Sequence, residues 1–185
     1  DYAYHGTERI DGERIAGSGA AAITGRTNRQ TDRQTDRQTD RFTTEMTLNE
    51  VQDQIVEEFS VFDEWLDKYD YLIELSKELP PIDEKHRTEQ YVIKGCQSRV
   101  WVDAEMHDGQ VCVTADSDAI ITKGIIALLI RVLSGRTPEE ILGADLYFID
   151  RIGLRENLSP TRANGLLAMI KQMKLYALAF QNKKP

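Results

Sequence analysis

The sequence is poor in the features that mark several large classes of protein. Its 185 residues include only two cysteines, Cys96 and Cys112, too few for a disulfide-rich secreted scaffold or a four-cysteine zinc site. No apolar run approaches the roughly 20 residues of a membrane-spanning helix. No basic segment followed by an apolar one opens the chain, as a signal peptide would. These absences favour a cytoplasmic protein without a membrane partner.

The chain also lacks the excess of positive charge that nucleic-acid binding requires. It carries 23 Lys and Arg against 31 Asp and Glu, a formal net charge of −8. Neutralising phosphates takes concentrated basic side chains, so we expect no nucleic-acid partner. Hydrophobic residues make up 41% of the chain, which is enough to build a buried core.

The first 45 residues differ in composition from the rest. They hold seven arginines and no lysine, and Gln-Thr-Asp-Arg occurs three times between Gln30 and Arg41. A polar four-residue repeat cannot form an apolar stripe, so residues 1–45 are predicted to be a disordered, low-complexity tail. Because Met46 directly precedes the first helix signal, a non-native origin of the tail is a second interpretation. The folded domain is expected to span residues 46–185.

Helices are predicted on both sides of a central hairpin. Thr47 and Glu50 form a capping-box pattern at the first helix start. The apolar rhythm then runs on through Leu66 and Ile73 until Pro80 ends the helix. We therefore expect one apolar face along this whole segment.

Two strands are predicted next. Apolar and polar residues alternate over 100–105, and residues 111–114 are interpreted as the returning strand. Asp108-Gly109 between them is a hairpin signal. Later helix starts are indicated at Ser117 or Asp118, at Thr137-Pro138 and at Ser159-Pro160. The predicted fold class is α+β, a sandwich in which a small antiparallel sheet packs against helices.

Cys96 is the candidate reactive residue. It follows Gly95, which permits a sharp turn, and precedes a strand, so we expect it at the tip of a loop. Lys94 and Arg99 flank it, and nearby positive charge favours the thiolate, the form that attacks sulfur or carbon. The structural alternative for Cys96 is a small hydrophobe tucked under a turn.

The other cysteine and two histidines are expected to have no chemical role. Cys112 interrupts an apparent strand between two valines, a pattern typical of a buried structural residue. His86 lies in a charged connector and His107 beside the hairpin turn, so both are predicted at the surface and not beside Cys96 as its base. A metal site built from these residues would lack any closely spaced ligand pair.

Four blocks of sequence stand out in order along the chain: GCQSRVW at 95–101, DSDA at 116–119, KGIIA at 123–127 and LSPTRANGL at 158–166. Together these blocks resemble the SufE family of sulfur-acceptor proteins. The likeness extends over about residues 47–180, and its first block contains the candidate nucleophile.

The resemblance implies a SufE/IscU-like fold and a sulfur carrier that is not itself an enzyme. A SufS-like cysteine desulfurase would place persulfide sulfur on Cys96 and would be stimulated by losing it. A SufBCD-like scaffold complex would then receive the sulfur for iron–sulfur cluster assembly. Pyridoxal phosphate would belong to the desulfurase, and this chain would hold no cofactor and no metal.

The resemblance also points to residues around Cys96. Asp118 and Arg162 match family positions near the cysteine loop, with a helix cap and a surface ion pair as their structural alternatives. Lys123 and Gly124 match as well, and Gly124 is interpreted as letting its helix pack closely on the sheet.

Two other functions stay open at this point. One is a CsdE-type acceptor that serves another desulfurase and another sulfur destination. The other is an IscU-like scaffold or metal chaperone, although such scaffolds use several cysteines and this chain offers only Cys96 at that place.

Overall fold

The structure of the protein, a computed structural model, describes residues 46–183. The predicted tail at residues 1–45 lies outside the described residues. In chain order the elements are α2 (Leu48–Ser60), α3 (Trp65–Glu78), the short 3₁₀ helices η1 (Glu84–His86) and η2 (Glu89–Tyr91), β1 (Val100–His107), β2 (Gln110–Ser117), α4 (Ile120–Leu133), α5 (Pro138–Gly143), α6 (Phe148–Arg151), α7 (Leu154–Asn157) and α8 (Pro160–Gln181). This order of helices, hairpin and helices confirms the predicted α+β class. None of the described helices combines the length and the apolarity needed to cross a membrane.

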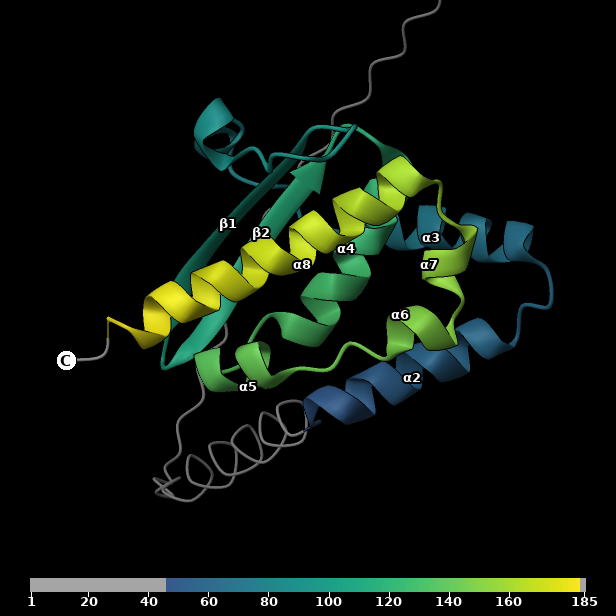
Figure 1. Cartoon of the computed structure of the whole chain (residues 1–185), viewed down its shortest axis with the longest axis horizontal. Helices are drawn as coiled ribbons and strands as arrows, with labels where there is room; N and C mark the ends of the chain where they lie inside the picture. The colour runs from purple at the N-terminus through teal and green to yellow at the C-terminus, as the bar shows by residue number, and fades with distance from the viewer. Residues whose placement is uncertain (1–45, 184–185) are drawn as a thin grey trace, which may run out of the picture. The chain divides into compact units, whose positions relative to one another are not determined.

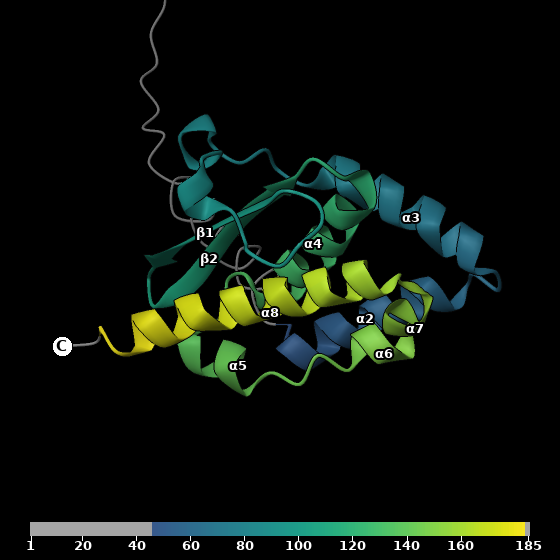
Figure 2. The ribbon, with the colours of Figure 1, turned by 45° about the horizontal axis from the view of Figure 1, so that its top comes forward.

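The α-helices form layers on one side of the hairpin. Helix α8 runs along β1, and α4 packs against β2 (Figures 1 and 2). Helices α2 and α3 contact α4 in turn, so α4 is the central helix of the fold. Its buried residues include Ile126 and Leu129, both with no exposed surface. The core therefore lies between the sheet, α4 and the surrounding helices.

The hairpin is antiparallel, and within the described residues its sheet has two strands. Asp108 and Gly109 have φ of 49° and 83°, as the two central residues of a tight hairpin turn require. Val102 pairs with Ala115, so apolar residues of both strands share the inner face. Strand β2 extends three residues beyond the predicted end at Thr114, because the pairing continues as far as Ser117.

The first two helices confirm one prediction and correct another. Thr47 and Glu50 make the predicted capping box, and α3 ends before Pro80. The predicted apolar face along α3 is wrong, however, because Leu66 is 72% exposed while Leu72 is fully buried. The break between Ser60 and Trp65 changes the phase of the second helix, so the rhythm of α2 does not carry over.

Helices α3 and α4 approach each other very closely at Gly124. A Cβ atom at this position would lie 2.2 Å from the backbone oxygen of Leu72. Gly124 therefore permits contact between two helix backbones. The prediction that it allows packing on the sheet is wrong, because the neighbour is α3.

We predict that Gly124→Ala destabilises the fold by about 3 kcal/mol, because backbone atoms must shift to accept the added carbon. Urea unfolding of both proteins measures the difference. Gly143→Ala is the matched control, since a Cβ at Gly143 meets nothing within 4 Å. Equal stability of the two variants would contradict the close approach of α3 and α4.

Candidate functional site

Cys96 lies at the tip of the loop formed by residues 94–98, just before β1. The preceding Gly95 has a φ of +94°, a conformation that side chains with a Cβ rarely adopt. Nothing lies within 4 Å of where a Cβ on Gly95 would be. The glycine is therefore required by the backbone turn and not by crowding, which agrees with the turn predicted from the sequence.

Hydrogen bonds hold both ends of this loop. The Ile93 amide donates to the Val100 carbonyl over 2.8 Å, which joins the segment before the loop to the start of β1. On the other side, the Arg99 amide donates to Asp118 Oδ1 over 3.0 Å. The Ser117 hydroxyl donates to the Arg99 carbonyl over 2.8 Å. The base of the loop is thus fixed, and Cys96 stands on a short segment between fixed ends.

The same contacts correct the predicted start of α4. Its N-cap residue is Ala119, and neither Ser117 nor Asp118 occupies that position. The Ser117 hydroxyl accepts a hydrogen bond from the Ala119 amide, and the Asp118 carboxylate faces Arg99. Both side chains turn toward the cysteine loop because its backbone groups need partners there.

The tip of the loop rests on the first turns of α8. Cys96 Sγ donates to the Gly165 carbonyl over 3.6 Å, and Thr161 Oγ1 donates to Gln97 Oε1 over 3.0 Å. A Cβ on Gly165 would lie 3.4 Å from Cys96 Sγ, so this glycine leaves room for the thiol. No role was predicted for Gly165. A glycine inside a helix costs about 1 kcal/mol relative to alanine, and that cost was the available signal of a packing role.

A cavity of about 20 Å³ lies beside the thiol. The loop, α4 and α8 all contribute to its walls. The residues that define its chemistry are Cys96, Ser98, Thr122, Ile125, Arg162 and Met169.

Burial raises the pKa of the half-buried Cys96 thiol. This result reverses the predicted effect of the two flanking cations. The Arg99 guanidinium pairs with Glu89, and Lys94 is exposed and does not line the cavity. In the conformation described, Cys96 is therefore held as a thiol.

The structure treats the two supporting candidates differently. Arg162 lines the cavity together with Cys96, and no ion pair joins it to any residue that the structure describes. Asp118 does not line the cavity and contacts the loop at its base through Arg99. The structure therefore places Arg162 at the cavity beside the thiol, whereas Asp118 contacts the backbone of the loop that carries Cys96.

The remaining candidates lie away from the cavity. Cys112 pairs with Glu105 on the outer face of the sheet and is half-buried, so the prediction that it is buried is wrong. The His86 side chain is only 13% exposed and lies 3.3 Å from Asp103, because the connector folds over the sheet. His86 was therefore wrongly predicted at the surface, whereas the exposed His107 was predicted correctly. Within residues 46–183, no three His, Cys, Asp or Glu side chains gather as metal ligands.

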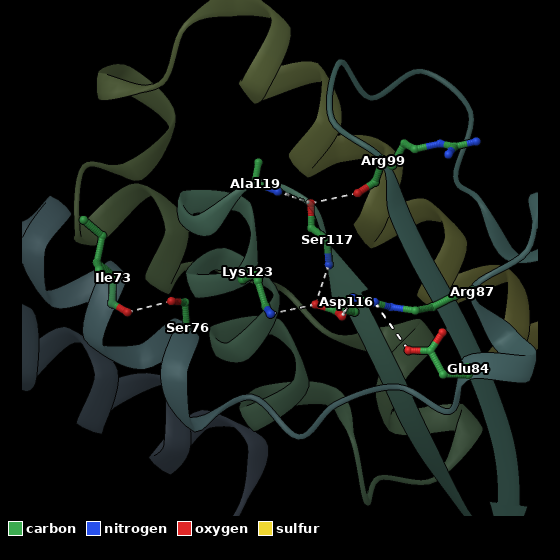
Figure 3. Close-up of polar contacts among 9 residues, drawn as sticks. All are labelled: Ile73, Ser76, Glu84, Arg87, Arg99, Asp116, Ser117, Ala119 and Lys123. Carbon is green, nitrogen blue, oxygen red and sulfur yellow. Dashed lines mark hydrogen bonds and ion pairs between the residues drawn. The ribbon is translucent and has the colours of Figure 1, made fainter.

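The buried carboxylate of Asp116 joins three segments around the base of the loop (Figure 3). Its side chain is 4% exposed and contacts the Arg87 guanidinium, the Lys123 ammonium at 3.0 Å and the Ser117 amide at 2.8 Å. Burial alone raises the pKa of Asp116, but the hydrogen bonds from Lys123, Ser117 and Arg87 outweigh it and lower the pKa. No role was predicted for Asp116, because its partner Arg87 is remote in sequence.

Comparison with known proteins identifies relatives of this chain. A family model described as "SufE: Fe-S metabolism associated domain" matches residues 53–177. An uncharacterized SufE-like protein of Rhizobium meliloti is 42% identical over 129 residues, which cover 66% of this chain and 91% of the relative. An uncharacterized SufE-like protein of Synechocystis is 39% identical over 128 residues, covering 69% of this chain and 80% of the relative.

Two further matches extend the comparison. The Arabidopsis thaliana "SufE-like protein 1, chloroplastic/mitochondrial" is 41% identical over 131 residues, which cover 70% of this chain and 35% of that protein. The solution structure of a hypothetical protein from Thermus thermophilus superposes with a TM-score of 0.61 at 24% identity, covering 72% of this chain and 97% of that one. The last match shows that the two proteins share a fold.

We predict that Gly165→Val speeds the alkylation of Cys96 by iodoacetamide about fivefold, as expected when one hydrogen bond that holds the thiol is lost. The valine branches need the space that the sulfur occupies. Gly165→Ala is the matched control, because its Cβ makes only an ordinary contact at 3.4 Å. Mass spectrometry reports both thiols at once, so Cys112 is the internal reference. An unchanged rate at Cys96 would show that Gly165 does not hold it.

We predict that Asp116→Asn lowers the free energy of unfolding at pH 7 by about 2 kcal/mol, since charged hydrogen bonds are lost. The pKa of Asp116 is lowered in the folded state. Its contribution is therefore complete above the unfolded value of about 3.9 and is lost as pH falls through the folded pKa.

The difference between the Asp116→Asn variant and the unmodified chain should accordingly shrink in urea titrations below about pH 4. Glu74→Gln, which breaks an exposed pair with Lys77, is the control and should change stability by less than about 0.5 kcal/mol. A difference that does not vary with pH would contradict the charged network.

Proposed function

We propose that this chain, which belongs to the SufE family of proteins associated with iron–sulfur metabolism, is a sulfur carrier and not itself an enzyme. Cys96 accepts persulfide sulfur from a cysteine desulfurase. The desulfurase turns over faster when this sulfur is removed from its own cysteine. The carrier then delivers the sulfur to iron–sulfur cluster assembly. The observation that carries the proposal is the position of Cys96, at the tip of a short loop whose two ends are fixed.

The proposed transfer is a thiol–disulfide exchange. The Cys96 thiolate attacks the outer sulfur of the donor persulfide, so a new S–S bond forms at Cys96 while the donor's own S–S bond breaks. The donor cysteine leaves as a thiolate and takes up a proton equivalent to the one that Cys96 lost. One S–S bond replaces another, and no external oxidant or reductant is consumed.

The resting conformation keeps Cys96 from this reaction. The thiol donates to the Gly165 carbonyl, and burial raises its pKa, so the reactive thiolate is scarce. Moving the tip off α8 breaks this contact and the hydrogen bond between Thr161 and Gln97. The exposed thiol then regains an ordinary pKa, and thiolate forms where a donor can reach it.

The fixed base limits this movement to residues 94–98. Gly95 supplies a flexible backbone position beside the cysteine, and its surroundings leave space for rotation. Ile93 and Arg99 keep their hydrogen bonds when the tip moves. The desulfurase therefore meets a cysteine presented on a short projection from a folded body.

The proposed partners follow from the family. A SufS-like desulfurase holds the pyridoxal phosphate, and a SufBCD-like complex receives the sulfur. Asp118 and Arg162 are the supporting residues, the first at the base of the loop and the second at the cavity wall. The cytoplasmic location stays a prediction, since the Arabidopsis relative carries a chloroplastic/mitochondrial name.

We predict that incubation with a cysteine desulfurase and free cysteine adds one sulfur atom, about 32 Da, to Cys96 through persulfide exchange. Cys96→Ser should abolish this adduct and the stimulation of the desulfurase, because a hydroxyl cannot accept the sulfur. Intact-protein mass spectrometry and desulfurase turnover measure the two effects.

Cys112→Ser is the matched control in this experiment. Cys112 lies half-buried on the outer face of the sheet, so its replacement should leave both the adduct and the stimulation unchanged. A persulfide found on Cys112, or normal stimulation by Cys96→Ser, would refute the proposed carrier. About one metal ion per chain, lost on replacing Cys96, would instead indicate the scaffold alternative. A CsdE-type role would show as stimulation of a different desulfurase.

A further inference from the structure

The cavity beside Cys96 has a size suited to one additional atom. Its volume is about 20 Å³, and a cavity needs roughly 10–15 Å³ to hold a single water molecule. Ile125 and Met169 give it apolar walls, while Thr122 places a polar side chain among them. A thiol that gains one sulfur atom would need such a space if its loop returned to α8.

Thr122 carries a buried hydroxyl group that has no hydrogen-bond partner among the described residues. It lies in the first turn of α4 and is 8% exposed. A threonine in a helix commonly donates to a carbonyl one turn earlier. Here no hydrogen bond joins the Thr122 hydroxyl to any residue in the described part of the chain. A buried hydroxyl without a protein partner is destabilising unless the space beside it holds a water molecule or a ligand that accepts its hydrogen bond.

The hydroxyl is not sealed inside the core. Among the described residues, Trp65 Nε1 is the fully enclosed polar side-chain atom that lacks a partner, and the Thr122 oxygen is not in that state. The oxygen therefore faces accessible space, and the space that Thr122 lines is the cavity shared with Cys96.

We propose that the outer sulfur of the Cys96 persulfide occupies this cavity and accepts a hydrogen bond from Thr122. The inference rests on the proposed function, since it concerns the persulfide that the carrier forms. A persulfide is a stronger acid than a thiol, so its outer sulfur is negatively charged near neutral pH. Such an anion against apolar walls is unfavourable unless a donor faces it. Thr122 supplies that donor, and Arg162 at the same cavity supplies positive charge.

The other hydroxyls of the cavity are less suited to this task. The Thr161 hydroxyl already donates to Gln97. Ser98 belongs to the loop and moves with Cys96, so it cannot mark a fixed resting place. Thr122 stays on α4, the central helix, and meets the sulfur each time the loop returns. Thr122 is therefore a positioning residue that retains the outer sulfur of the Cys96 persulfide.

The test uses a persulfide prepared without a desulfurase. In the full chain with Cys112→Ser, Cys96 is converted to a mixed disulfide with an aromatic thiol, and sulfide then displaces that thiol. The new S–S bond at Cys96 forms as the aromatic thiolate leaves, so the product is the Cys96 persulfide. Its loss to dithiothreitol is followed over time by intact-protein mass spectrometry.

The unmodified Thr122 is compared with Thr122→Val and Thr122→Ser. We expect the persulfide of Thr122→Val to be lost about fivefold faster, as for the removal of one hydrogen bond. Thr122→Ser restores the hydroxyl and should restore the slow rate, which a merely structural role of the threonine would not require. Thr114→Val, an exposed change on β2, is the matched control and should decay at the unmodified rate.

Equal rates for Thr122 and Thr122→Val, or fast loss from Thr122→Ser, would overturn the proposal. Equal melting temperatures of the variants show that each measured rate belongs to a folded protein. A parallel loading with desulfurase and cysteine tests the proposed function separately. Failure of that loading, together with a clear effect of Thr122→Val on the chemically formed persulfide, would refute the carrier and leave the sulfur site in place.

Discussion

The buried carboxylate of Asp116 is the interaction on which the geometry of the site depends. It joins the connector through Arg87, the end of β2 through Ser117 and the start of α4 through Lys123 (Figure 3). A carboxylate that is 4% exposed would be unstable without these partners. Because Ser117 is fixed next to it, the following Asp118 is fixed as well. Those two residues hold Arg99 and so determine where the cysteine loop ends.

The site balances protection of a thiol against its reactivity. Contact with Gly165 and burial keep Cys96 protonated, and a protonated thiol is slow to oxidise and slow to attack. Exposure of the thiol, as the proposed transfer requires, would reverse both effects together. The Asp116 carboxylate is held by several charged contacts, whereas two hydrogen bonds join the loop tip to α8. Reactivity can therefore be coupled to the arrival of a partner without any rearrangement of the core.

Local sequence patterns predicted the elements whose determinants are local. The Thr47 capping box and the Asp108-Gly109 turn depend on residues adjacent in the chain, and both are present. The prediction of the apolar face of α3 was wrong, because the phase of that face depends on where α2 ends. Gly124 was assigned to the wrong neighbour because close packing against α3 is a tertiary contact.

The site shows the same division between local and remote determinants. The position of Cys96 at a loop tip follows from Gly95 and the strand behind it, so the sequence was sufficient to find it. Its protonation state was not predictable, because Arg99 pairs with Glu89 and the burial of the thiol comes from α8. Gly165 lies 69 residues from Cys96 in the chain, and no sequence pattern near Cys96 indicates its contact with the thiol. The candidate nucleophile can thus be identified from one short block of sequence, whereas the surroundings of its thiol form only when the loop, α4 and α8 meet.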